Sequence, residues 1–145
     1  MNATHASPRE RIVEAAPRVL LGLAFLLPGT LKLALPWTVL AASYGPGAPF
    51  MRSLLETGYL FYVLAGAQIT CGALLLANRF VPLALTVLAP IILNIVLFHL
   101  WVAPHLRGFV MSTLVVSLEL VMVSRYRAVF APLLRARHIA VPNAE

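Results

Sequence analysis

The chain has 145 residues, of which 61% are hydrophobic and only 11% are charged, and its mean hydropathy is +0.89. A soluble domain carries about 25% charged residues, so this composition excludes a surface made mainly for water and predicts one compact membrane domain. The net charge of +6 does not indicate nucleic-acid binding, because the arginines stand at the ends of apolar segments instead of forming a patch with aromatic residues.

Cysteine and histidine are too sparse to predict redox or metal chemistry. Cys71 is the single cysteine and lies in an apolar segment, so we expect it to be a packing residue. None of the histidines has a second histidine three or four residues away, so we expect no metal site. A haem would have only His99 as an axial ligand within a span, which is an unspecific signal.

The first membrane span is predicted over residues 17–35. Pro28 lies inside it and is expected to kink the helix, because proline has no N–H and collides with the preceding turn. Gly22 and Gly29 are seven residues apart and share one helix face, which would let another helix come close. Lys32 lies near the end of the span, from where it is expected to extend to the membrane interface.

A long connection over residues 36–57 follows the first span. Residues 44–47 read Tyr-Gly-Pro-Gly and indicate a turn. Residues 49–56 place apolar side chains on one face and the i,i+4 pair Arg52 and Glu56 on the other. We therefore expect a short amphipathic helix on the membrane surface.

The second span is predicted over residues 59–77 and the third over residues 82–104. The turn between them is very short, so these two spans should form an antiparallel hairpin. The second span carries small residues at helical spacing that predict a close-packing face: Gly66, Thr70, Ala73 and Ala77.

The third span is the predicted centre of the bundle. It is almost wholly apolar, yet it contains Asn94 near its middle and His99 near its end, and Pro90 should bend it. The fourth span, residues 109–123, contains Glu119. Polar side chains are costly in hydrocarbon, so these residues should face protein or a cavity.

The distribution of Lys and Arg predicts the orientation. Eight of these residues fall on one side of the predicted spans, and only Lys32, Arg52 and Arg107 fall on the other. Cytoplasmic loops carry an excess of Lys and Arg, so both termini are expected in the cytoplasm. The predicted fold is an all-α, four-span bundle, divided into an N-terminal segment (1–16), a membrane domain (17–134) and a basic tail (135–145).

Gln68, Asn94 and Glu119 are the polar residues predicted to bridge helices. Gln68 is the nearest candidate partner of Asn94 at mid-depth. For Glu119, two interpretations stay open. It either forms an ion pair or hydrogen bond, for example with Arg18 or Arg79, or it handles protons as a carboxyl that titrates near neutral pH.

The outer end of the predicted bundle is the candidate binding site. A quinone head needs hydrogen-bond donors for its carbonyls, an apolar slot for its tail and a depth near one interface. The residues expected to converge at that end are Lys32, His99, Trp101 and Tyr62.

Several short motifs make the chain resemble the DoxX-like family of small four-span membrane proteins. They are Arg18-x3-Gly22-Leu23-x-Phe25, Gly29-x2-Lys32-Leu33, Gly66-x5-Gly72, the segment from Asn94 to His99, Glu119, and residues 127–133. The resemblance covers most of the chain and implies a four-helix membrane bundle of the bacterial inner membrane. Some relatives act beside thiosulfate–quinone or other redox enzymes. Many members carry a glutamate where this chain has Gln68, which puts any role of that acid in doubt here.

The predicted spans, their polar residues and the resemblance together lead us to expect one of two functions. The first is an accessory or anchoring subunit of a respiratory or photosynthetic membrane complex, with other membrane subunits as partners and no catalytic residues of its own. It is favoured because no group of residues has the geometry that an enzyme needs. The alternative is a quinone-linked redox or proton-handling protein with its site at the ends of spans 1 and 3.

Overall fold

A computed structural model describes residues 8–134, and this part of the chain contains helices and no strand. The prediction of an all-α protein is therefore confirmed. The predicted basic tail, residues 135–145, and the first seven residues lie outside the described range.

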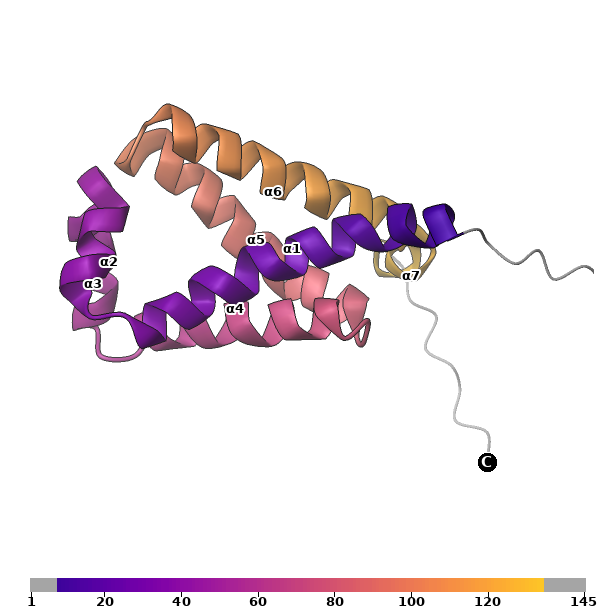
Figure 1. Ribbon diagram of the computed structural model, residues 1–145, viewed down its shortest axis with the longest axis horizontal. Helices are drawn as coiled ribbons and strands as arrows, with labels where there is room; N and C mark the ends of the chain where they lie inside the picture. Colours follow the sequence, from indigo (N-terminus) through magenta and orange to yellow (C-terminus); the bar gives the residue numbers. More distant parts are fainter. Residues whose placement is uncertain (1–7, 135–145) are drawn as a thin grey trace, which may run out of the picture.

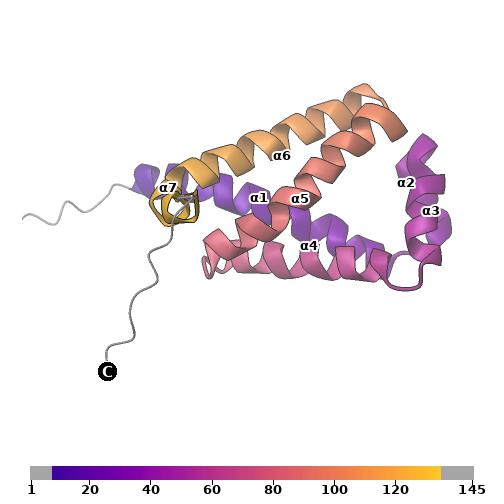
Figure 2. The ribbon, with the colours of Figure 1, turned by 180° about the vertical axis from the view of Figure 1, so that it is seen from behind.

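Four long helices form the body of the molecule: α1 (Pro8–Ala34), α4 (Leu60–Leu76), α5 (Val81–Leu97) and α6 (Leu106–Arg125). Figures 1 and 2 show α1 beside α4, while α5 runs diagonally from the end of α4 to the start of α6. The start of α1 and the short segments α7 (Arg127–Phe130) and η3 (Ala131–Leu134) lie at one end of this bundle, here called the terminal end.

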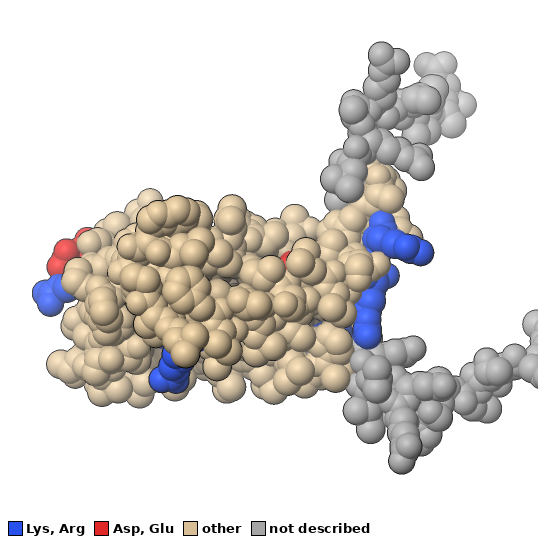
Figure 3. Space-filling model, turned by 90° about the horizontal axis from the view of Figure 1, so that it is seen from above, with Lys and Arg blue, Asp and Glu red and all other residues tan. Residues whose placement is uncertain are grey.

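Three segments of the described chain are long and apolar enough to cross a membrane: Ala15–Ala34, Val81–Val102 and Leu106–Arg125. A fourth is obtained if α4 is joined with residues Trp37–Glu56, from which it is bent by 101°. Figure 3 agrees with this composition, because Lys and Arg lie toward the two ends of the visible face and leave a broad, almost uncharged band between them. These observations are consistent with a multi-pass membrane protein.

The opposite end of the bundle is covered by a helical hairpin. Helix α2 (Trp37–Tyr44) leads through the tight turn η1 (Gly45–Gly47) into α3 (Ala48–Glu56). Leu40 of α2 and Met51 of α3 are buried together with Phe61 of α4. Figures 1 and 2 show the two short helices crossing from the α1–α4 pair toward the junction of α5 and α6. We call this the hairpin end.

The sequence predicted only part of this hairpin. The turn and the helix over residues 49–56 are present, and Arg52 Nε donates to Glu56 Oε1 at 2.9 Å, as the i,i+4 spacing predicts. Helix α2 was missed, because its sequence WTVLAASY carries no charged residue and so shows no polar face that would reveal helical periodicity.

The third span ends in an irregular turn. After α5, residues Phe98–Val102 (η2) form a π-helical turn, in which Ala103 N–H donates to Phe98 O at 2.9 Å. Gly47 of the hairpin lies so close to the Phe98 ring that a Cβ at this position would overlap it. The hairpin thus rests on the end of the third span as well as on α4.

Helices α1 and α4 come close through glycine, as predicted for Gly22 and Gly29. A Cβ added to Gly29 would lie 3.1 Å from Gln68 Cβ and 3.2 Å from Ala65 O, and one added to Gly22 would lie 3.1 Å from Gly72 O. The predicted packing face of α4, however, is not covered by another helix of this chain within the described residues. Gly66 has no atom near its missing Cβ, and the other three residues of that row are exposed.

The phase of the helix decides which small residues of α4 meet α1. Ala65, Gln68 and Gly72 share the face of α4 that α1 covers, and all three are buried. A periodic row of small residues marks a smooth helix face, but it does not say whether a neighbouring helix of the same chain covers it.

Gly72→Ala is expected to lower the free energy of unfolding by about 1–3 kcal/mol, because overpacking forces the backbones apart. The new Cβ would lie 2.7 Å from Leu26 N and 2.8 Å from Gly22 O, which are backbone atoms. Thermal unfolding in mild detergent can be followed by a dye that labels Cys71, which is only 4% exposed in the folded protein. Gly66→Ala is the matched control and should be near neutral; equal losses in both variants would contradict the prediction.

Candidate functional site

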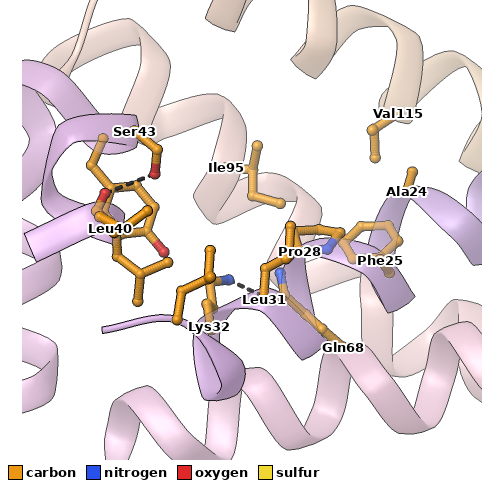
Figure 4. A pocket seen from close by; sticks show the side chains of 13 residues that line it. Ala24, Phe25, Pro28, Leu31, Lys32, Leu40, Ser43, Gln68, Ile95 and Val115 are labelled. Carbon is orange, nitrogen blue, oxygen red and sulfur yellow. Dashed lines mark hydrogen bonds between the residues drawn. The ribbon is translucent and has the colours of Figure 1, made fainter. Parts of the chain in front are cut away.

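A cavity of about 290 Å³ lies between the hairpin and the bundle. Helix α1 forms one side of it and α2 another, while α4, α5 and α6 contribute one residue each. Figure 4 shows Lys32 and Gln68 on one wall, Leu40 and Ser43 facing them from α2, and Ile95 behind. The full lining is Ala24, Phe25, Pro28, Leu31, Lys32, Leu35, Val39, Leu40, Ser43, Tyr44, Gln68, Ile95 and Val115.

The polar centre of this wall is a hydrogen bond between α1 and α4. Lys32 Nζ donates to Gln68 Oε1 at 2.5 Å, and Gln68 is only 3% exposed. Gly29 precedes Lys32 by one turn, and its missing side chain lets the two helices approach closely enough for this contact. The sequence predicted that Lys32 extends to the membrane interface. In the structure its side chain instead contacts α4, where it bonds to Gln68.

The α2 wall carries two hydroxyl groups that differ in their hydrogen bonding. Ser43 Oγ donates to Leu40 O at 2.7 Å, so its proton is used within its own helix. Tyr44 packs its ring against Trp37, with centroids 6.4 Å apart, and its hydroxyl has no hydrogen-bond partner among the side chains described, those of residues 15–132. Both residues were missed as site candidates, because the helix that carries them was not recognised.

Of the four residues predicted to converge, the structure brings two together. Lys32 and Tyr62 line a second, smaller cavity of about 170 Å³, which lies between α1, α4 and the hairpin. Trp101 is 74% exposed and lines neither cavity.

His99 is held in a separate cluster with α6. Its Nδ1 lies 2.8 Å from Ile95 O and 3.0 Å from Ser112 Oγ, while Ser112 Oγ donates to Gly108 O at 2.8 Å. An Nδ1 that faces a carbonyl must carry the proton, so His99 serves as a donor that ties the end of the third span together. Gly108 is packed directly against its ring.

The predicted contact between Gln68 and Asn94 is not formed. Gln68 faces α1 and accepts from Lys32, while Asn94 is exposed and lines a different cavity of about 260 Å³ with Phe50, Leu60 and Pro90 among others. The two amides point to different neighbours because α1, and not α5, covers the face of α4 that holds Gln68.

Glu119 is buried in the half of the bundle toward the terminal end. It is 6% exposed, and neither carboxyl oxygen has a hydrogen-bond partner in the described structure. The predicted pairing with Arg18 is not formed, since Arg18 Nη1 donates to Leu75 O at 2.7 Å and to Leu76 O at 3.3 Å at the C-terminal end of α4. Arg79 is exposed and does not bond to Glu119 either.

Among the side chains that the structure describes, residues 15–132, no three His, Cys, Asp or Glu are grouped so that they could hold a metal ion. Comparison of the chain with protein-family models, curated proteins and solved structures found no match.

Glu119→Leu is expected to leave the melting temperature unchanged or to raise it. Removing a buried polar group that lacks a partner also removes its desolvation cost. Ser117→Leu on the exposed side of the same helix controls for added apolar surface. A loss of about 3–5 kcal/mol in Glu119→Leu would instead indicate that Glu119 is one member of a buried ion pair.

Proposed function

We propose that this protein holds a small hydrophobic molecule in the membrane by its polar head, in the cavity at the hairpin end, and that the head is of the quinone type. The observation that carries the proposal is the hydrogen-bonded pair of Lys32 and Gln68 on the wall of an otherwise apolar cavity. Ligand sites are typically of this kind, with mostly apolar walls and a few oriented polar groups.

The chemistry of the pair suits a head group that accepts hydrogen bonds. An ammonium group has three N–H donors, and Gln68 accepts from one of them, so two are available to a ligand. Gln68 also restrains the flexible lysine side chain, which lowers the entropic cost of binding. The cavity volume of about 290 Å³ fits a head group with the first part of its tail.

The cellular setting is part of the same proposal. We place the protein in the bacterial inner membrane as a four-span member of the DoxX-like family, with both termini in the cytoplasm. The exposed Arg79, Arg125 and Arg127 support this orientation, because they lie at or beside the terminal end, where basic residues favour the cytoplasmic side.

An alkyl quinone analogue is expected to raise the melting temperature of the purified protein, and Lys32→Met should abolish most of this shift. The physical reason is the loss of the hydrogen-bond donors that hold the head. Thr30→Val on the exposed face of the same helix is the matched control, because Thr30 Oγ1 donates to the carbonyl oxygen of Leu26 in the same helix and does not line the cavity. Failure of all quinone analogues to shift the wild-type protein would count against a quinone ligand.

The second candidate is an accessory or anchoring subunit of an electron-transfer complex. The observation that favours it is the outward row of small residues on α4, since Gly66 meets no atom of its own chain and Thr70, Ala73 and Ala77 are exposed. Such a face lets a helix of another subunit come close.

Purification in mild detergent, followed by mass spectrometry and an absorption spectrum, separates the two candidates. A subunit is expected to bring a stable set of partner proteins, and Gly66→Leu should then reduce their recovery by blocking the close approach of a helix. A lone protein that retains a bound quinone would exclude the subunit role and support the binding protein.

A further inference from the structure

We propose that the head of the ligand is an anion, so that the cavity selects an amphiphile with a carboxylate or an acidic enol at Lys32. This inference rests on the proposed binding function and specifies the chemical class of the ligand. It goes beyond a neutral quinone, whose carbonyls accept hydrogen bonds but carry no charge.

Lys32 has no counter-ion among the side chains that the structure describes. The acidic residues of the chain are Glu10, Glu14, Glu56, Glu119 and Glu145. Within the part of the chain whose side chains are described, Glu56 pairs with Arg52 and Glu119 has no hydrogen bond. The described partner of Lys32 is therefore the neutral amide of Gln68. A cation enclosed by apolar groups is costly unless an anion compensates it, and a ligand can supply that anion.

The polar groups of the cavity wall that remain available to a ligand are hydrogen-bond donors. Since the ammonium group of Lys32 can only donate, the atom of Gln68 that faces it is the amide oxygen, and the amide NH₂ stays unpaired in the described structure. Tyr44 adds a hydroxyl without a partner among the described side chains, whereas Ser43 Oγ donates its proton to Leu40 O. The side chains of Lys32, Gln68 and Tyr44 thus offer hydrogen-bond donors, which suits a head that accepts only.

The position of Lys32 along its span also suits a charged head group. Lys32 lies two residues before the end of α1, which is the end of a candidate span. An anionic head must stay near an interface, while a tail needs apolar walls deeper in the bundle, such as those of Phe25, Ile95 and Val115. The cavity provides both on one side of the hairpin.

The test compares two matched pairs of ligands on the full chain in nanodiscs of zwitterionic lipid. One pair is a 2-hydroxy-3-alkyl-1,4-naphthoquinone and its 2-methoxy ether; the other is a fatty acid and its methyl ester. In each pair the acidic compound is expected to bind roughly tenfold more tightly or better, because hydrogen bonds to a charged group are the stronger ones. Thermal shift and equilibrium dialysis measure the affinities. The acidic compound that binds more tightly shows whether the head group is an acidic enol or a carboxylate.

Variants assign the preference to the cavity. Lys32→Met should reduce the acid-over-ether ratio to about one. Arg107→Gln removes a positive charge from the start of α6 without touching the cavity and should leave the ratio unchanged, which controls for general attraction of anions to this end. Tyr44→Phe is expected to lower the affinity of the acid by less than Lys32→Met does, because it removes one neutral donor.

The outcomes distinguish this inference from the proposed function. Equal binding of acid and ether, both lost in Lys32→Met, would overturn the anionic head but leave the binding function standing. No binding of any compound would overturn both. A Lys32-dependent shift caused by sodium chloride alone, with no further effect of the amphiphiles, would assign the site to a small inorganic ion and would also overturn the inference.

Discussion

The close contact between α1 and α4 is the constraint on which the rest of the structure depends. Gly22, Gly29 and Gly72 remove the side chains that would keep the two backbones apart, and an added Cβ at Gly72 would meet backbone atoms of α1. Only at this short separation does Lys32 reach Gln68. The polar group of the candidate site is therefore a product of glycine packing, since a wider spacing would leave both side chains in apolar surroundings without a partner.

The hairpin of α2 and α3 turns this contact into a site. Helix α2 supplies Leu40, Ser43 and Tyr44 opposite Lys32, and the hairpin rests on the third span where Gly47 meets Phe98. Without that cover the Lys32–Gln68 pair would face open surroundings, and with it the pair faces a bounded cavity. The His99 cluster supports this arrangement indirectly, because it holds the end of the third span against α6.

The half-buried Lys32 and the buried Glu119 have opposite surroundings. Lys32 lies at the hairpin end beside hydrogen-bond donors and a cavity, whereas Glu119 lies within the core toward the terminal end, one helical turn beyond Val115, with no described partner. They do not pair with each other, because Lys32 bonds to Gln68 and neither carboxyl oxygen of Glu119 has a hydrogen-bond partner in the described structure. Arg18 is not available to Glu119, because it bonds to the last carbonyl groups of α4.

The sequence alone determined the all-α fold, the apolar segments, the turn at residues 44–47 and the glycines of α1, because composition and local spacing carry these features. It also indicated that Lys32 and Gln68 are functional or bridging residues. However, it placed Lys32 at the membrane interface and paired Gln68 with Asn94. Only the tertiary structure decided that they pair, that Gly66 faces outward, and that His99 and Trp101 lie apart from the cavity. The physical reason is that helical periodicity defines which residues share a face, whereas the rotation of each helix against its neighbours is decided by packing across the whole bundle.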